Sequence, residues 1–180
     1  MRVFLNPGHA PNGEPDPGAC GWGIRECDVA KNVADLVAGY LTAAGVEVVG
    51  NLQSDSLEEV VDVSNESEAD IFISIHCNAC NGNARGTEVW YYHRSANGEL
   101  LADCIRHQIV DALGTADRGS KGAKPGVNGL YVLSNTGATA VLVELAFIDN
   151  EDDAQLLCEK QDEFARAIAR GVTDYEQEVF

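Results

Sequence analysis

The sequence predicts a single α/β domain built on a largely parallel sheet, and three observations support this. Segments with strand-like hydrophobic patterns alternate along the chain with segments in which apolar residues recur at helical spacing. Residues 69–76 and 138–145 are almost continuously apolar, which is typical of strands covered on both faces. The chain has 180 residues, 45% of them hydrophobic, which is enough to bury a core without a covalent staple.

The first half of the chain alternates strands and helices. The first helix is predicted by apolar residues at helical spacing, with Asp28 as its expected N-cap and Gly45 as its stop. The third strand is predicted by the run ADIFISIH, which ends at His76. The expected elements are a strand at 2–5, a helix at 29–44, a strand at 46–49, a helix at 57–68 and a strand at 69–76.

The second half continues this alternation around a polar stretch. GTEVWYY alternates as a half-buried strand does, and Gly114 ends a helix with a clear apolar stripe. A polar, glycine-rich stretch then predicts a loop. The expected elements are a strand at 86–92, a helix at 100–113, a loop at 117–128, strands at 130–133 and 138–145, and a helix at 149–175. The domain is therefore expected at 1–175, followed by a tail at 176–180.

Charge and cysteine content exclude some classes of partner and of scaffold. Twelve Lys and Arg against 29 Asp and Glu give a net charge of −17, so nucleic acid and anionic membranes are not electrostatic partners. Six cysteines are too sparse for a disulfide scaffold in a domain with its own core. We expect reduced and mostly buried thiols.

Four polar residues fall where the expected strands end. His9 follows the first strand, Glu26 lies before the first helix, His76 ends the third strand and Glu144 closes the run ATAVLVE. The carboxyl ends of parallel strands lie along one edge of an open α/β sheet. We therefore expect these four side chains to share that edge.

Each of the four has a simpler interpretation when it is considered alone. Glu26 suits a first-turn acid beside a helix dipole, and His9 suits an exposed residue at a strand end. His76 and Glu144 are harder to explain, because each ends an apolar run where a polar group needs a partner. Two imidazoles and a carboxylate form the ligand set of a catalytic zinc site. A further carboxylate would supply the general base.

The remaining histidines and cysteines offer one rival site. His93 and His107 are expected on the surface. Cys77 and Cys80 form a C-x-x-C beside His76 and raise a Cys/His zinc cluster as an alternative. That cluster requires a second close cysteine pair, and Cys20 and Cys27 have the wrong spacing for one.

At these residues the chain resembles the zinc-dependent N-acetylmuramoyl-L-alanine amidases of the Amidase_3 family, the catalytic domains of autolysins and endolysins. The resemblance covers nearly the whole chain in the family's order. The matching stretches are NPGH, RECDVAKNVADLVAGYLTAAGVEV, SNESEADIFISIHCNA, GTEVWYY, LYVLSNTGATAVLVELAFIDN and FARAIARGV. The chain departs from the commoner pattern at Asn6, where an aspartate usually stands, and it lacks a glycine after ELAF and an arginine in the helix before SN.

The resemblance implies a twisted, mostly parallel six-stranded sheet flanked by helices, of the phosphorylase/hydrolase-like type. It implies one Zn²⁺ per chain, held by His9, Glu26 and His76, with Glu144 as the catalytic carboxylate. The implied reaction is hydrolysis, by zinc-activated water, of the amide between the lactyl group of N-acetylmuramic acid and L-alanine of the stem peptide. Substrate-binding residues stay unassigned, although residues 118–128 form a candidate wall.

Two other functions remain open at this point. A metallopeptidase on a related fold would use a similar metal set and an arginine, Arg85 or Arg118, for a terminal carboxylate. A non-catalytic wall-binding or regulatory module would be favoured if the metal ligands or Glu144 were missing from the sequence. All four residues are present.

The expected partner is bacterial peptidoglycan, and the expected place of action is the cell wall. Since a charge of −17 would repel an anionic wall polymer, affinity must come from specific groups or from a separate wall-binding module. No run approaches the about 20 apolar residues of a membrane span, and the opening MRVFLNPGH is too short for a signal peptide. We therefore expect cytoplasmic synthesis with holin-type release, or an excised extracellular domain.

Overall fold

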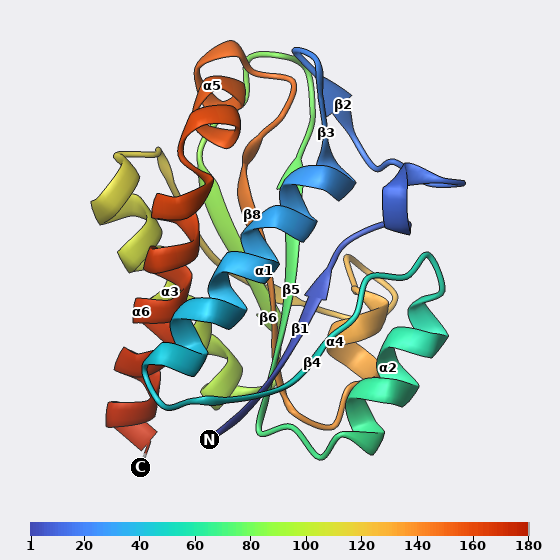
Figure 1. Cartoon of the computed structure of the whole chain (residues 1–180), viewed down its shortest axis with the longest axis vertical. Helices are drawn as coiled ribbons and strands as arrows, with labels where there is room; N and C mark the ends of the chain where they lie inside the picture. The colour runs from blue at the N-terminus through green and yellow to red at the C-terminus, as the bar shows by residue number, and fades with distance from the viewer. Residues whose placement is uncertain (180) are drawn as a thin grey trace.

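Six strands form one sheet through the middle of the computed structural model, which describes residues 1–179 (Figure 1). The strand order is β4-β1-β5-β8-β6-β7, and every neighbouring pair is parallel except β6 and β8. The predicted α/β class and the mostly parallel six-stranded sheet are confirmed. The strands are β1 (Arg2–Pro7), β4 (Glu47–Asn51), β5 (Ile71–Asn78), β6 (Thr87–Tyr92), β7 (Asp117–Ala123) and β8 (Thr139–Phe147), with a separate hairpin of β2 (Cys20–Gly21) and β3 (Ile24–Arg25).

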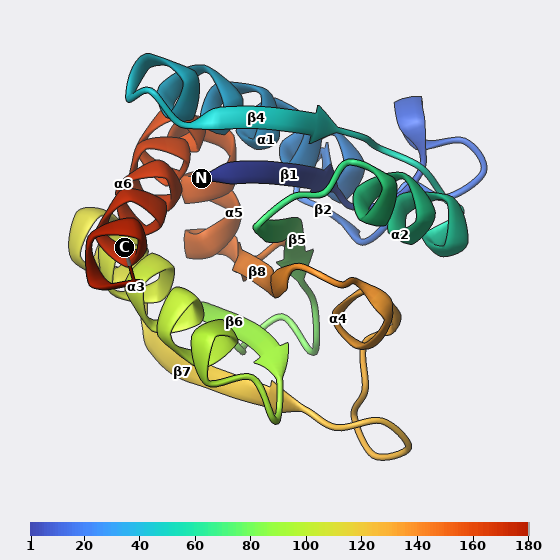
Figure 2. The ribbon, with the colours of Figure 1, turned by 90° about the horizontal axis from the view of Figure 1, so that it is seen from below.

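Helices cover the two faces of the sheet unequally, as Figure 2 shows. The three longest helices pack on one face, which we call the core face, while α2 and α4 pack together on the other, the site face. The helix α5 contacts β8. The helices are α1 (Glu26–Ala43), α2 (Leu57–Glu66), α3 (Ala96–Leu113), α4 (Tyr131–Asn135), α5 (Glu151–Glu159) and α6 (Gln161–Val179), with a 3₁₀ turn η1 (Pro11–Gly13).

Alternation along the strands separates two hydrophobic clusters. In β5, Ile71, Ile73 and Ile75 lie in the larger cluster, on the core face. Phe72 lies in the smaller cluster with residues of α2 and α4. Successive side chains of a strand point to opposite faces, so the continuous apolar run of β5 reflects cover on both faces, as predicted.

The sheet register aligns polar residues across three neighbouring strands. His76 of β5 is the register partner of Glu144 of β8, and Glu144 is on its other side the partner of Glu88 of β6. Register partners in adjacent strands point to the same face. The three side chains therefore form a row on the site face, since His76 lies four residues beyond Phe72.

Two stretches differ from the sequence prediction. Residues 117–123, expected in a loop, form the edge strand β7 parallel to β6. Residues 130–133, expected as a strand, mostly belong to the short helix α4. An edge strand has one neighbour and tolerates polar residues, so β7 lacks apolar alternation. The four apolar residues LYVL are too few for periodicity to separate a strand from a helix.

Some helix limits also differ from those expected. The first helix begins at Glu26 and its N-cap is Arg25, so Asp28 lies inside its first turn instead of capping it. The helix expected at 149–175 divides at Lys160, whose backbone leaves the helical conformation.

The last helix continues beyond the expected domain limit at residue 175. α6 runs to Val179, because Tyr175 packs in the core and Glu176 lies 3.5 Å from the amino terminus of Met1. Residues 176–179 of the expected tail are therefore helical, and Phe180 lies outside the described residues. Within residues 1–179, no helix combines the length and apolarity that a membrane crossing requires.

Candidate active site

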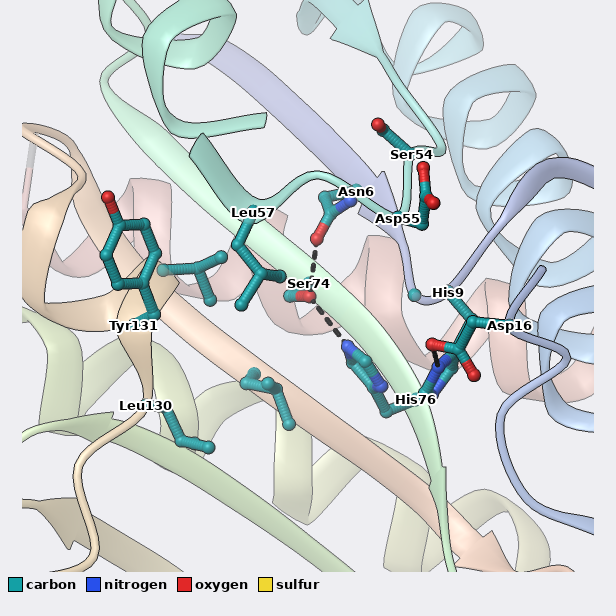
Figure 3. Close-up of a pocket in the computed structure, with 13 residues that line it drawn as sticks. Asn6, His9, Asp16, Ser54, Asp55, Leu57, Ser74, His76, Leu130 and Tyr131 are labelled. Carbon is teal, nitrogen blue, oxygen red and sulfur yellow. Dashed lines mark hydrogen bonds and ion pairs between the residues drawn. The ribbon is translucent and has the colours of Figure 1, made fainter. Parts of the chain in front are cut away.

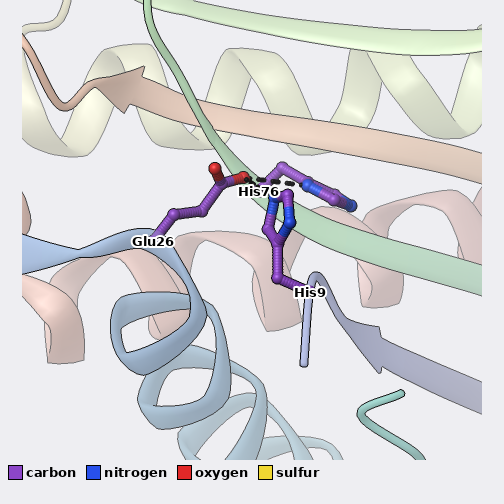
Figure 4. Close-up of side chains that lie close together, drawn as sticks. All are labelled: His9, Glu26 and His76. Carbon is purple, nitrogen blue, oxygen red and sulfur yellow. Dashed lines mark hydrogen bonds and ion pairs between the residues drawn. The ribbon is translucent and has the colours of Figure 1, made fainter. Parts of the chain in front are cut away.

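Three side chains from separate segments meet at the carboxyl end of the central strands (Figure 4). His9 follows β1, Glu26 begins α1 and His76 lies in β5. Glu26 Oε1 lies 3.0 Å from His9 Nε2 and 2.9 Å from His76 Nδ1. One ligand atom of each residue lies within 4.8 Å of the others, so the group could hold a metal ion. The structure thus brings together the three residues that the resemblance named as ligands.

Two glycines make this close approach possible. A Cβ atom on Gly8 would lie 2.3 Å from His76 Cε1, and one on Gly18 would lie 2.5 Å from His9 Cδ2. Any larger residue at either position would have to displace an imidazole. His9 itself has φ 67°, a left-handed conformation that is uncommon outside glycine and is often found at functional sites.

Groups outside the cluster orient His9 and Glu26. Asp16 Oδ2 lies 2.7 Å from His9 Nδ1, so it fixes the ring with Nε2 toward Glu26. The backbone N–H groups of Ala19 and Cys77 donate to the two Glu26 oxygens at 2.8 and 3.0 Å. Such supporting bonds fix ring orientation and tautomer in metal sites.

A second chain of hydrogen bonds orients His76. The Asn6 amide nitrogen donates to the Leu52 carbonyl at 3.0 Å, so its oxygen faces Ser74, whose hydroxyl donates to it at 2.7 Å. Ser74 Oγ also lies 3.1 Å from His76 Nε2. Because the hydroxyl proton is used toward Asn6, Ser74 can accept from His76 Nε2–H, which leaves Nδ1 available as a ligand atom. The departure at Asn6 therefore affects support for His76.

Charge complementarity within the cluster shifts the pKa of both His9 and Glu26. Burial opposes charge on His9, but hydrogen bonds to Glu26 and Asp16 outweigh it and raise the pKa of His9 to about 9. Burial likewise opposes charge on Glu26, yet His76 and His9 hold the pKa of Glu26 well below its usual range. Glu26 is therefore ionised at neutral pH, which is the charge state in which a carboxylate binds a cation.

Glu144 lies one strand away from this cluster, on the same face of the sheet. Its Oε2 is buried, and no hydrogen-bond partner within residues 1–179 contacts it. Burial raises the pKa of Glu144 to about 7, with His76 opposing the rise and Glu26 and Glu88 adding to it. A carboxyl group with a pKa near neutrality is able both to accept and to release a proton at that pH.

Sequence reasoning missed Glu88, a buried carboxylate beside Glu144. Glu88 Oε2 accepts from Arg118 Nε at 2.7 Å and from Lys121 Nζ at 2.6 Å, while Oε1 accepts from Trp90 and Asn78 at 3.1 Å each. The sequence GTEVWYY contained a sign of this role, because Glu88 is a charged residue inside a strand and lies on the same strand face as Trp90. Two residues of the predicted substrate wall, Arg118 and Lys121, thus lie in β7.

Two cavities adjoin the site residues. The larger, of about 330 Å³, contains His9 and His76 and extends toward α2 and α4 (Figure 3). The smaller, of about 180 Å³, contains Glu144. Leu130 lines both cavities. The other residues of the smaller cavity are Asn78, Glu88, Trp90 and Asn128.

The cysteines do not join the cluster. Within residues 1–179, the group that could hold a metal consists of His9, Glu26 and His76 alone. Cys77 packs in the cluster on the core face, and burial raises the pKa of its thiol well above the usual value. Only Cys27 and Cys77 of the six are buried, so the expectation of mostly buried thiols is wrong.

Sequence comparison places this arrangement in a family. Residues 3–174 match the Amidase_3 family of N-acetylmuramoyl-L-alanine amidases. The chain belongs to this amidase family. The N-acetylmuramoyl-L-alanine amidase LytC of Bacillus subtilis is 36% identical over 96% of the chain, and the endolysin of Bacillus phage SPP1 is 37% identical over 94%. The chain spans 35% of the first relative's length and 62% of the second's.

A solved amidase has the same fold over its full length. The N-acetylmuramoyl-L-alanine amidase of Clostridium difficile superposes with a TM-score of 0.88 and 28% identity. The match covers 99% of this chain and 98% of that one. The architecture described here is therefore that of an amidase catalytic domain.

Proposed function

We propose that this chain hydrolyses the amide bond between the lactyl group of N-acetylmuramic acid and L-alanine of the peptidoglycan stem peptide. One observation carries the proposal. The cluster of His9, Glu26 and His76 lies on the same sheet face as Glu144, whose buried Oε2 has no partner among residues 1–179. Family membership supplies the substrate class.

The cluster fits one zinc ion. Two imidazole nitrogens and a carboxylate oxygen converge, and this is the donor set of open catalytic zinc sites. His9, Glu26 and His76 would hold the ion, with Asp16 and Ser74 orienting the two rings. When bound, zinc polarises a carbonyl group and lowers the pKa of water toward about 7.

Glu144 is proposed to move the proton. It takes a proton from the attacking water as the new C–O bond forms at the lactyl carbonyl. It then passes this proton to the leaving nitrogen of L-alanine as the C–N bond breaks. The products are a carboxylic acid and an amine, and the acid then loses the second proton of the water to solvent. A pKa of about 7, raised by burial, suits a group that must accept and donate at neutral pH.

The setting we propose is the bacterial cell wall. Longer relatives, of which this chain spans 35% and 62%, have room for other modules, and a net charge of −17 gives this domain no general attraction to an anionic wall. We therefore propose that a separate module or local delivery brings the domain to its substrate, as an autolysin or as a phage lysin.

Metal analysis combined with product analysis tests the proposal. We expect one equivalent of zinc in the parent and in Cys77→Ser, and strong loss of zinc in His76→Ala. We expect the parent to release stem peptides with a free L-alanine amine from purified sacculi. Full zinc in His76→Ala would refute the ligand set, and cleavage of ordinary peptides without a muramoyl group would favour the metallopeptidase alternative.

A further inference from the structure

Two cations on the edge strand share one carboxylate beside Glu144. Arg118 Nε and Lys121 Nζ both contact Glu88 Oε2, at 2.7 and 2.6 Å. Within this group of three, buried Glu88 supplies one negative charge against two positive ones, and the neighbouring Glu144 is the other carboxyl group of the smaller cavity. The net positive charge of this group of three contrasts with the −17 of the chain, and it attracts an anionic group.

Both cations are held in place and still have donors to offer. The Lys121 ammonium lies 5.3 Å from the centre of the Trp90 ring, and the Arg118 guanidinium lies 4.8 Å from that of Phe147. Their side chains remain 35% exposed for Arg118 and 32% for Lys121. Within residues 1–179, no hydrogen bond involves Arg118 Nη2, and Glu88 is the one hydrogen-bond partner of Lys121 Nζ. The pair is therefore ordered before any ligand arrives, which reduces the entropy cost of binding.

The proposed mechanism determines which part of the substrate lies in each of the two cavities. A group that protonates the leaving nitrogen must lie within hydrogen-bond reach of it, so the alanine side of the scissile amide lies toward Glu144. Glu144 lines the smaller cavity together with Glu88 and Trp90. The peptide therefore leaves the cluster toward β7, where Lys121 is the register partner of Trp90.

The opposite direction suits the muramoyl group. The larger cavity reaches from His9 and His76 to an apolar wall that includes Leu57 and Tyr131, which are 51% and 43% exposed. Its polar rim carries Asp55 but no Lys or Arg. An uncharged sugar with acetyl and lactyl methyl groups fits these walls, whereas a peptide carboxylate would meet an acid.

We propose that Arg118 and Lys121 form a subsite for the free carboxylate of the acidic residue that follows L-alanine in the stem peptide. This inference rests on the proposed function, because Glu144 sets the direction of the peptide. In stem peptides this residue is joined through its side-chain carboxyl, so its α-carboxyl group is either free or amidated. The subsite makes the enzyme prefer the free acid.

A pair of substrates tests the subsite. The probes are N-acetylmuramoyl-L-alanyl-γ-D-glutamyl-L-lysinamide, whose one free carboxylate on the peptide is the α-carboxyl of the glutamyl residue, and the same molecule with that carboxyl amidated. Both are cleaved by the zinc-loaded chain. We expect the parent to cleave the acid with a kcat/KM at least about tenfold higher, as one charge-assisted contact provides. Lys121→Gln leaves Arg118 paired with Glu88, and this variant should lose most of the preference for the acid over the amide. Lys121→Arg should retain the preference.

A control variant and a binding measurement complete the design. Lys31→Gln removes the same charge from α1, on the core face, and should keep the parent's preference. Calorimetry with the product peptides, L-alanyl-γ-D-glutamyl-L-lysinamide and its α-amide, measures the subsite without turnover.

The outcomes separate the subsite from the function. Equal cleavage of both substrates by the parent, or an equal loss on both in Lys121→Gln, would overturn the subsite and leave the amidase function standing. Calorimetric binding that prefers the acid and depends on Lys121 would support the subsite. If such binding were seen while neither substrate was cleaved, the subsite would stand and the proposed amidase function would be refuted.

Discussion

The two faces of the sheet are built from the same strands, yet the core face serves only hydrophobic packing, whereas the site face also carries the candidate catalytic residues. The core face is covered by α1, α3 and α6, of 18, 18 and 19 residues, and the buried strand residues of its cluster are aliphatic apart from Cys77. The site face carries α2 and α4, of 10 and 5 residues. Along β5 this face presents Phe72, then Ser74, then His76. The change from apolar to polar happens within five residues.

This difference shows how a strand can serve packing and chemistry at once. Because alternate residues point to opposite faces, β8 places Val141, Val143 and Leu145 in the core while it presents Leu142 and Glu144 to the groove. Polar residues on one face do not interrupt the apolar set on the other. Substitutions on the two faces should therefore separate activity from stability.

The largest expected effect is on the site face. Glu144→Gln preserves side-chain shape, so we expect normal zinc content and a normal melting temperature. Turnover should fall roughly 10²–10⁴-fold, the usual contribution of a positioned proton-transfer group. The assay is muropeptide cleavage per folded, zinc-loaded molecule. A variant that melts normally, binds zinc and cleaves at the parent rate would contradict the assigned role.

A matched pair of truncations compares the two faces directly. Ile73→Ala empties a fully buried position of the core face and should cost about 2–5 kcal/mol in the free energy of unfolding. Leu57→Ala, at a position 51% exposed in the larger cavity, should change stability by less than about 0.5 kcal/mol. Urea denaturation of both variants checks this. Similar losses would show that the site face also carries core packing.

The contribution of Glu88 to stability should depend on pH, which distinguishes this charged residue of the site face from the apolar residues of the core face. Burial opposes its charge, but hydrogen bonds from Lys121 and Arg118 hold the pKa of Glu88 below its ordinary value of 4.5. A lowered folded-state pKa adds stability above the unfolded value, and this stability is lost as the pH falls through the folded value. Glu88→Gln should therefore cost about 1–3 kcal/mol at neutral pH, and less in acid.

Denaturation at neutral pH and at the lowest pH where both proteins fold tests this expectation for Glu88. A penalty that is equal at both pH values would mean that shape, and not charge, explains the loss. Asp28→Asn, at an exposed ion pair with Arg25 on α1, is the control and should have little effect at either pH.

The smallest expected effect concerns the whole surface. With a net charge of −17, the isolated domain should bind purified sacculi weakly. Added salt screens like-charge repulsion, so binding should stay the same or improve slightly as salt rises. Co-sedimentation at several salt concentrations measures this. Tight binding that salt abolishes would show an attractive electrostatic contact.

The sequence was sufficient for the central strands β1, β5 and β8 and for the meeting of His9, Glu26 and His76 at one sheet edge, because both follow from where apolar runs end. His9 and His76 close or nearly close apolar runs, and parallel strands bring such positions to one edge. The edge strand β7 was missed because its polar residues face the groove and solvent, so no alternation marks it. Glu88 and the Ser74–Asn6 pair were missed because their partners come from distant segments, and pairing across strands cannot be deduced from one strand alone.

Both imidazoles rest against bare backbone, at Gly8 and Gly18. These positions carry no side chain and take no part in proton transfer, yet the smallest possible enlargement of either would push a histidine out of place. Tolerance to random mutation should therefore be low at these two residues although they have no chemistry of their own. A library built to alter substrate preference would keep more active members if these two codons were left unchanged and diversity were directed to β7.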